Sequence, residues 1–181
     1  MIYNSAILVT YPYEDSINEA IELSKAAEYN IIKIVTQKEI TKSKFGIGAG
    51  KAKELQEFVE NLNPGVIIFD EVIKPSQQYN LATLCKREVI DRERLILEIF
   101  EKRSKTSESN IQIKLAQLRY EMVRAKEKVR LAKKGEQPGF FGLGKYDADV
   151  YILDIKRRVA VLKKKIRKRK EKERSIQEPK D

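Results

Sequence analysis

Two long heptad patterns in the second half of the chain constrain the fold more than any other feature of the sequence. The first lies within residues 111–132 and the second within residues 152–166, and in both the apolar residues are separated alternately by three and four positions. This spacing places them along one side of an α-helix and is typical of a coiled-coil seam. The apolar residues are Ile111, Leu115, Leu118, Met122, Ala125, Val129 and Ala132 in the first helix and Ile152, Ile155, Val159, Leu162 and Ile166 in the second.

A turn-forming segment separates the two patterns. Residues 137–144 contain Pro138 and three glycines, which interrupt helices and favour turns. Two helices of coiled-coil type joined by such a segment predict an antiparallel helical hairpin. Residues 106–109, Thr-Ser-Glu-Ser, offer a capping site for the first helix. The second helix is expected to end in the almost wholly charged run at residues 163–174.

The first half of the chain has a different pattern, in which apolar runs alternate with segments of helical spacing. Strands alternating with helices predict an α/β fold with a small four-stranded parallel sheet, flanking helices and right-handed crossovers. The expected strands lie within residues 2–10, 31–36, 66–70 and 88–91. The expected organisation is a parallel α/β subdomain at residues 1–92, a helical hairpin (coiled coil) at residues 93–174, and a tail or linker at residues 175–181.

Charge is distributed unevenly between the two halves. The chain has a formal net charge of +10, of which residues 1–90 contribute −2 and residues 91–181 contribute +12. Such asymmetry is typical of a globular domain beside a part that meets a polyanion, either nucleic acid or an anionic membrane surface. We expect the hairpin to be the binding part, with an affinity that falls steeply as the salt concentration rises.

The turn of the hairpin combines cations with aromatic rings. Cations beside rings suit both the phosphates and the unstacked bases of RNA. The alternative interpretation is that the rings form an apolar plug under the turn while the lysines are only solvated. The candidate RNA-binding residues are Lys126, Arg130, Lys133, Lys134, Phe140, Phe141, Lys145 and Tyr146.

Several kinds of site are excluded by composition. The chain has no histidine and a single cysteine, Cys85, which we interpret as a small helix residue. Histidine general bases, Ser-His triads, an internal disulfide and most zinc sites are therefore excluded. The sequence predicts no catalytic residue and no metal site. Without a run of membrane-spanning length or a signal peptide, the sequence predicts a cytoplasmic protein.

A glycine-rich segment could bind a nucleotide. The residues are Gly46, Gly48, Gly50 and Lys51, and glycines leading into a helix can expose backbone N–H groups to a phosphate. The spacing is one residue too short for a Walker loop, and Ala52 replaces its Ser or Thr. The dinucleotide-binding pattern is not matched either. We interpret the segment as a tight turn that starts a helix, with nucleotide binding as the weaker alternative.

Acidic residues follow two of the predicted strands. Asp70 and Glu71 end the third strand, where open α/β sheets commonly hold ligands, although such residues also form solvated rims and helix caps. Residues 91–94, Asp-Arg-Glu-Arg, could be a catalytic acid beside a cationic clamp. We favour a junction held by local ion pairs.

Five segments together resemble the amino-terminal region of the HflX family of ribosome-associated GTPases, in the order and spacing of that family. The resemblance covers about residues 31–166. The GTPase domain of that family has a Walker loop, an Asp-x-x-Gly switch and an Asn-Lys-x-Asp motif, none of which occurs here, so we expect an amino-terminal fragment. The matching segments are Gly46–Leu55, Ile68–Glu71, Pro75–Leu81, Asp91–Phe100 and Gln112–Tyr120.

The resemblance implies an α/β subdomain and a helical hairpin that precede a G domain. It implies binding to the large ribosomal subunit and its RNA, with the hairpin turn approaching the peptidyl-transferase centre and GTP hydrolysis governing release. GTP and magnesium belong to the missing G domain, so this fragment needs no cofactor and is not expected to hydrolyse GTP. Whether the biological task is ribosome splitting, rescue or assembly stays open, as does the oligomeric state.

Two alternatives remain at the level of sequence. The first is an ATP-binding or ATPase α/β domain seated at Gly46–Lys51 and Asp70. The second is a non-enzymatic basic coiled coil that meets a protein or a membrane.

Overall fold

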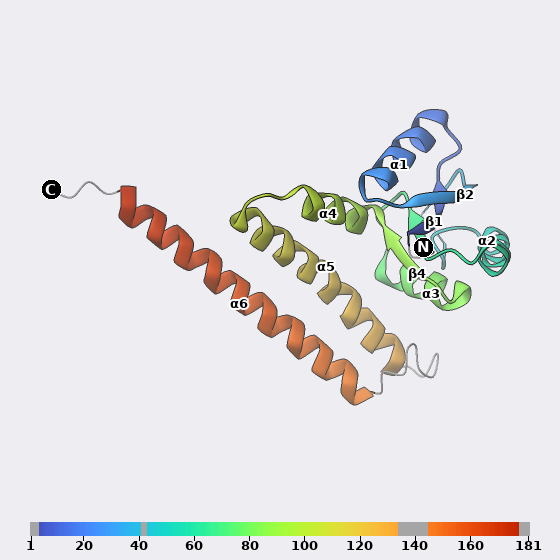
Figure 1. Cartoon of the computed structure of the whole chain (residues 1–181). Helices are drawn as coiled ribbons and strands as arrows, with labels where there is room; N and C mark the ends of the chain where they lie inside the picture. Colours follow the sequence, from blue (N-terminus) through green and yellow to red (C-terminus); the bar gives the residue numbers. More distant parts are fainter. Residues whose placement is uncertain (1–3, 41–42, 134–144, 178–181) are drawn as a thin grey trace. The chain divides into compact units, whose positions relative to one another are not determined.

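The computed structural model describes residues 4–40, 43–133 and 145–177 and divides into two compact units, residues 1–102 and 103–181 (Figure 1). The boundary falls later than the expected one at residue 92. The reason is that the helix following the last strand buries Leu95 and Ile99 in the core of the first unit.

The first unit contains a four-stranded sheet with the strand order β2-β1-β3-β4, and all three neighbouring pairs are parallel. The predicted α/β fold with a small parallel sheet and flanking helices is thus confirmed. The strands are β1 (Ser5–Thr10), β2 (Asn30–Thr36), β3 (Val66–Phe69) and β4 (Glu88–Asp91), and the helices are α1 (Glu14–Ala26), α2 (Ala49–Leu62), α3 (Pro75–Cys85) and α4 (Arg92–Arg103).

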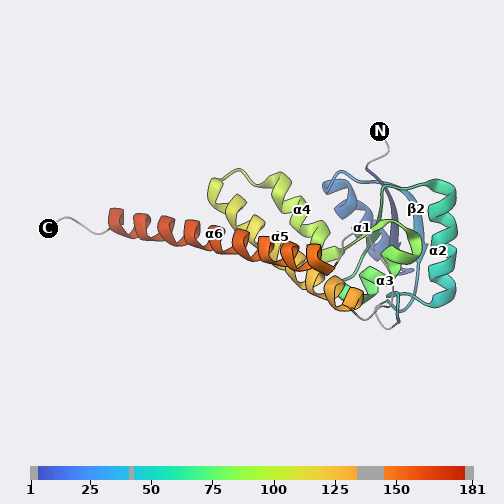
Figure 2. The ribbon, with the colours of Figure 1, turned by 90° about the horizontal axis from the view of Figure 1, so that it is seen from below.

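Helices cover both faces of this sheet. Figures 1 and 2 show α1 and α4 on one side and α2 and α3 on the other. Right-handed crossovers in this strand order require α1 to lie opposite α2 and α3. All four residues of β3 are buried, as expected for a central strand covered on both faces. The core on the α1 and α4 side consists of Ala6, Leu8, Ala20, Ala27, Val66, Ile68, Ile90, Leu95 and Ile99.

Local sequence determines where α2 ends and where α3 begins. After α2, Asn63 adopts a left-handed conformation (φ +47°), and the following Pro64 cannot continue the helix. Helix α3 begins with Pro75 at its first position, where the missing N–H has no helical partner to lose. The side-chain oxygen of Gln77 accepts a hydrogen bond from the Lys74 backbone N–H at 2.9 Å and completes the start of α3.

The second unit consists, among its described residues, of the helices α5 (Ser107–Lys133) and α6 (Lys145–Gln177). Helix α5 starts as the sequence predicts, because Thr106 Oγ1 accepts a hydrogen bond from the Ser109 N–H at 3.1 Å. Arg169 Nη2 donates to Ser107 Oγ at 2.7 Å, so the late part of α6 lies beside the start of α5.

Seven of the predicted seam residues lie in a core cluster of this unit. Leu118, Ala125 and Ile155 are buried together, and the partly buried residues packed against them are Met122, Ile152, Val159 and Leu162. That these helices form a coiled coil stays a prediction. Helix α6 continues to Gln177, so the segment expected to be tail or linker from residue 175 begins within a helix.

Candidate functional site

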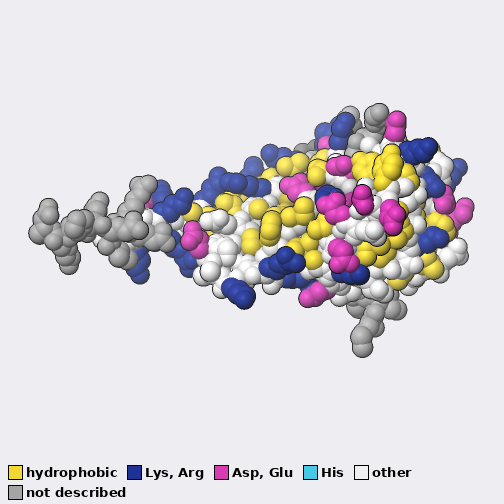
Figure 3. All heavy atoms as spheres, turned by 90° about the horizontal axis from the view of Figure 1, so that it is seen from above, with side chains coloured by type: hydrophobic (Ala, Val, Ile, Leu, Met, Phe, Trp, Pro, Cys, Tyr) yellow, Lys and Arg dark blue, Asp and Glu magenta, His cyan; other side chains and the backbone are white. Residues whose placement is uncertain are grey.

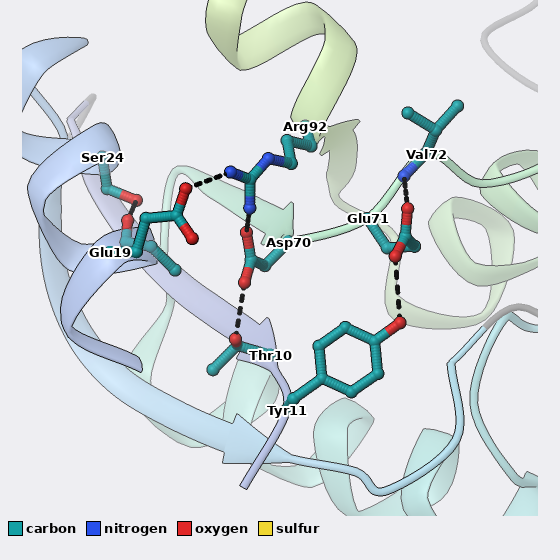
Figure 4. A network of polar contacts seen from close by, with 9 residues as sticks. Thr10, Tyr11, Glu19, Ser24, Asp70, Glu71, Val72 and Arg92 are labelled. Carbon is teal, nitrogen blue, oxygen red and sulfur yellow. Dashed lines mark hydrogen bonds and ion pairs between the residues drawn. The ribbon is translucent and has the colours of Figure 1, made fainter. Parts of the chain in front are cut away.

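The carboxyl ends of β1 and β3 meet at the centre of the sheet, where the strand order reverses. Thr10 is the last residue of β1, and Asp70 directly follows β3. Open α/β sheets commonly hold their ligands at this position. In this chain the two side chains bind each other, because Thr10 Oγ1 donates a hydrogen bond to Asp70 Oδ2 at 2.7 Å (Figure 4).

Arg92 occupies the other side of the Asp70 carboxylate. It is the first residue of α4, and its Nη1 donates to Asp70 Oδ1 at 2.8 Å, while its Nη2 contacts Glu19 of α1 (Figure 4). The Asp70 side chain is 4% exposed and the Arg92 side chain is 28% exposed. Both carboxylate oxygens of Asp70 are thus engaged by the protein itself, and the network joins four elements of the fold.

The pKa values of this pair follow from burial and from the partners. Burial raises the pKa of the Asp70 carboxyl above its ordinary value, although the Thr10 hydrogen bond and the Arg92 charge act in the opposite direction. For the Arg92 guanidinium, burial lowers the pKa, but Glu19 and Asp70 outweigh burial and leave the pKa raised. Arg92 therefore remains a cation that is committed to two carboxylates.

A second polar contact lies beside the first. Tyr11 OH donates to Glu71 Oε2 at 2.9 Å, and Glu71 Oε1 accepts a hydrogen bond from the Val72 backbone N–H at 2.9 Å (Figure 4). Burial, and then the hydrogen bond and charge of Glu71, raise the pKa of the Tyr11 phenol. Glu71 acts here as a cap of the segment that follows β3.

Residues 91–94 form a junction held by ion pairs, of which Arg94–Glu98 is local, as favoured from the sequence, while those of Arg92 reach Asp70 and Glu19. Asp91 Oδ1 accepts a hydrogen bond from the Arg94 N–H at 3.1 Å at the start of α4. Arg94 Nε pairs with Glu98 Oε1 at 2.7 Å, and Glu98 Oε2 accepts a hydrogen bond from Tyr29 OH at 2.8 Å. The side chains of this segment thus hold α4 within the first unit.

The glycine-rich segment packs against the end of β3. Gly46 has φ +78°, a conformation that L side chains rarely adopt, and a Cβ there would lie 3.2 Å from Phe69 Cζ. Gln77 Nε2 donates to the Ser43 carbonyl at 2.6 Å, and Asn80 Nδ2 donates to the Lys44 carbonyl at 3.1 Å. The segment is therefore anchored by α3, and Gly46 is required by the turn that precedes α2.

The other members of the predicted nucleotide site lie at the start of α2. Gly48 is the N-cap residue of α2, and Gly50 lies in its first turn; a Cβ at either position would meet nothing within 4 Å. Lys51 Nζ pairs with Glu54 Oε2 at 2.6 Å, three residues further along the same helix. The geometry agrees with a tight turn that starts a helix and brings no group toward a phosphate.

The cations of the second unit are arranged differently from those of the first. Ten Lys and Arg side chains of α6 between residues 156 and 170 are exposed, and Figure 3 shows Lys and Arg gathered along the helical part of the molecule. Arg158 pairs with Asp154 at 2.8 Å, and Arg167 pairs with Glu171 at 3.4 Å. Among the described residues, no ion pair involves Lys156, Arg157, Lys163, Lys164, Lys165, Lys168 or Lys170.

The structure describes the side chains of only some of the predicted RNA-binding residues. Lys126 and Arg130 are exposed on α5, where Arg130 Nη2 pairs with Glu127 Oε1 at 2.6 Å. Lys133 belongs to α5, and Lys145 and Tyr146 belong to α6, but their side chains lie outside the described part. Lys134, Phe140 and Phe141 lie outside the described residues.

Other reactive groups give no sign of a catalytic centre. Burial raises the pKa of the Cys85 thiol to about 11, so the thiol is a poor nucleophile near neutral pH. Within residues 4–40, 43–133 and 145–177, no group of three or more acidic or thiol side chains could hold a metal ion. No helix in this part of the chain is long and apolar enough to cross a bilayer.

Sequence reasoning missed most partners in the central network. Thr10, Glu19 and Glu98 were not predicted as site residues, because their partners lie 60, 73 and 69 positions away in sequence. Thr10 could have been found, since it ends a predicted strand next to the one that ends before Asp70.

Two family models match nearly the whole chain. The model described as "GTP-binding GTPase N-terminal" matches residues 14–101, and that described as "GTP-binding GTPase Middle Region" matches residues 103–179. The border between the two matches coincides with the border between the two compact units.

Curated relatives named GTPase HflX are similar over most of the chain. The relative from Methanocaldococcus jannaschii is 43% identical over 156 residues, which are 86% of this chain and 39% of that protein. The relative from Thermococcus kodakarensis is 39% identical over 142 residues, which are 78% of this chain and 32% of that protein. The chain thus spans less than half the length of these relatives.

A solved structure is also similar. The GTP-binding protein from the hyperthermophilic archaeon Sulfolobus solfataricus, in complex with GDP, superposes with a TM-score of 0.67 and 27% sequence identity. The match covers 92% of this chain and 46% of that protein.

Proposed function

Because this chain belongs to the HflX family of GTP-binding proteins, we propose that it is the ribosome-binding, amino-terminal part of a longer GTPase. In this proposal the second unit contacts ribosomal RNA of the large subunit in the cytoplasm. The first unit is a compact α/β support, and its last helix, α4, precedes the helical unit in sequence.

One observation carries the proposal: the exposed cations of α6 that form no ion pair within the described residues. A cation already paired on its own helix must lose that partner before it binds a phosphate, whereas an unpaired one releases counterions on binding. Lys163, Lys164 and Lys165 follow one another on α6, so they present positive charge around a large part of the helix. Such a helix suits a phosphate backbone that approaches from more than one direction.

The turn between α5 and α6 is the second contact in this proposal. Lys133, Lys134 and Lys145 supply cations there, and Phe140, Phe141 and Tyr146 supply rings on which unstacked bases can stack. For the turn to reach a recessed RNA site, α5 and α6 must stay together as a stiff pair. We therefore include in the proposal that they close as an antiparallel coiled coil along the seam.

GTP and magnesium belong, in this proposal, to a G domain of the longer protein. The described residues of this chain offer no metal ligands in a group of three. We expect this chain by itself not to hydrolyse GTP. An ATP-binding role of the first unit is less favoured, because Lys51 pairs with Glu54 and Asp70 is engaged by Thr10 and Arg92.

The test is binding of the chain to purified large ribosomal subunits at several salt concentrations, measured by co-sedimentation. The α6 variant Lys163→Ala, Lys164→Ala, Lys165→Ala should bind more weakly, with a slope of log affinity against log salt reduced by about 2 to 3. A control variant removes three exposed cations of the first unit: Lys25→Ala, Lys38→Ala and Lys53→Ala. Equal losses in both variants would mean that only net charge matters and would contradict the proposal.

A second arm tests the turn. The variant Lys133→Ala, Lys134→Ala, Lys145→Ala should lower affinity for large subunits by a similar factor. Unchanged binding would remove the turn from the contact and leave α6 as the binding surface. Enrichment on anionic lipid vesicles without any affinity for the ribosomal subunit would favour the membrane-binding alternative instead.

A further inference from the structure

The side of α6 that faces away from the seam carries exposed aliphatic residues. Val150 is 53% exposed, Leu153 is 51% exposed and Val161 is 54% exposed. At 100° per residue, these three positions lie within one sector of the helix, opposite the buried Ile155 of the seam. We call Val150, Leu153, Arg157 and Val161 the outer stripe, because Arg157 lies in the same sector.

The outer stripe is not explained by contacts within the helical unit. Exposed aliphatic side chains scattered singly are normal on protein surfaces, but three on one helical face within about 17 Å are a patch. The stripe continues toward the end of α6 with Lys164 and Lys168, so its character changes from aliphatic to cationic along one face.

The charges along this face determine what could cover it. Asp154, at the edge of the stripe, is compensated by Arg158 at 2.8 Å, whereas Arg157, Lys164 and Lys168 form no ion pair within the part of the chain that the structure describes. A second copy of the same face would bring these cations against one another. A complementary surface must therefore carry carboxylates beside apolar side chains.

RNA does not fit the aliphatic half of this face. Val150, Leu153 and Val161 have no group that binds a phosphate and no ring on which a base could stack. Apolar protein surface does fit, because it removes the exposed aliphatic area from water.

We propose that the outer stripe docks an acidic amphipathic helix of a protein partner. Aliphatic residues of that helix pack on Val150, Leu153 and Val161, and its carboxylates pair with Arg157. This is helix-to-helix recognition through a small set of apolar anchors and flanking charges. It goes beyond the proposed RNA contact and assigns the start and the end of α6 to different kinds of partner.

The experiment uses two fluorescent synthetic helices and the whole chain, with fluorescence anisotropy as the readout. The acidic helix has leucines at heptad positions flanked by glutamates, and the basic helix has lysines in place of the glutamates. The acidic helix should bind saturably, and the basic helix should bind at least about tenfold more weakly. Absence of saturable binding of the acidic helix up to about 1 mM would overturn the proposal.

The variant Val150→Gln, Leu153→Gln, Val161→Gln removes the aliphatic area while keeping charge and helix propensity, and circular dichroism checks that the helices persist. It should bind the acidic helix about tenfold more weakly. The matched control is Val123→Gln, an equally exposed aliphatic residue (55%) on α5, which should bind as the wild type does. Equal weakening by Val123→Gln would overturn the assignment.

Two further outcomes would assign the stripe to another occupant and overturn the proposal. One is a loss of affinity for large ribosomal subunits in the triple Gln variant while its binding of the acidic helix is unchanged. The other is self-association of the wild-type chain in analytical ultracentrifugation that the triple Gln variant abolishes.

Discussion

The two units of this chain use charge in opposite ways. In the first unit, ionic side chains join elements far apart in sequence: Arg92 contacts Asp70 and Glu19, and Lys102 pairs with Glu28. In the second unit, the ion pairs of α6 join residues four apart on the same helix, and most of its cations are exposed. The comparison indicates that charged groups join separate elements of the fold in the first unit and remain exposed on α6 in the second.

The same comparison applies to the apolar cores. The first unit buries strand and helix residues on both faces of a sheet, whereas the described core shared by α5 and α6 is a narrow cluster around Leu118, Ala125 and Ile155. A narrow core of this kind depends strongly on each member. The largest predicted effect is therefore that of truncating a buried residue in the core of the second unit.

Replacing Ile155 with Ala should unfold the second unit while the first unit stays folded. Ile155 is 1% exposed, and truncating such a residue costs about 2–5 kcal/mol. The measurement is hydrogen exchange followed by mass spectrometry, with protection lost in α5 and α6 only. The matched variant is Ile68→Ala in β3, which should lower protection in the first unit. Equal loss of protection in both units after Ile155→Ala would mean that they fold as one.

The next largest effect is on stability, and it differs in sign between Gly46 and Gly50 of the glycine-rich segment. Gly46→Ala should destabilise the first unit by about 1–2 kcal/mol, because φ +78° is unfavourable for L residues and the added Cβ meets Phe69. Gly50→Ala lies inside α2 in open space and should stabilise by about 0.5–1 kcal/mol. Urea unfolding followed by circular dichroism measures both. Two changes of the same sign would contradict the structural role assigned to Gly46.

Much of the fold was predictable because it depends on local periodicity. The alternation of apolar runs and helical spacing predicted all four strands and the helices between them. The spacing of residues 111–132 and 152–166 picked out residues that are buried together, among them Leu118, Ala125 and Ile155. The division expected at residue 92 stays a prediction, whereas α4 belongs to the first compact unit, and nothing local distinguishes α4 from the helices of the hairpin. Its place follows only from the burial of Leu95 and Ile99 against strands that precede it in sequence.

The candidate site was less predictable, because it consists of long-range contacts. Asp70 and Arg92 were noticed from the sequence, but neither Thr10 nor Glu19 was identified as a partner. Helix α5 also has a second buried face, including Tyr120 and Leu131, that the single seam did not predict. A heptad pattern marks the dominant apolar side of a helix and does not reveal a second one.

The third prediction concerns pH and the Asp70 network. Burial raises the folded-state pKa of Asp70 above the ordinary 3.8, so protonation favours the folded state. The contribution of Asp70 to the free energy of unfolding is therefore fully present below pH 3.8, where the carboxyl is protonated in both states. This contribution is lost as the pH rises through the raised folded-state pKa. Compared with Asp70→Asn, the wild type should lose unfolding free energy over that window in urea titrations. An increasing difference would mean that Arg92 and Thr10 outweigh burial.

The smallest predicted effect is that of Lys51→Ala, and it tests whether the first unit uses charge only for its own fold. Lys51 pairs with Glu54 within α2, at side-chain exposures of 31% and 43%, and partly exposed pairs of this spacing contribute about 0.3–0.5 kcal/mol. We expect a loss of that size in urea unfolding, with Glu54→Gln as the matched variant that removes the same pair. Isothermal titration calorimetry with ATP should show no binding heat for the wild type or for Lys51→Ala at millimolar nucleotide. Binding heat in the wild type that Lys51→Ala abolishes would show that this cation binds a ligand. The first unit would then also use a charged side chain of α2 for binding, which contradicts the comparison of the two units.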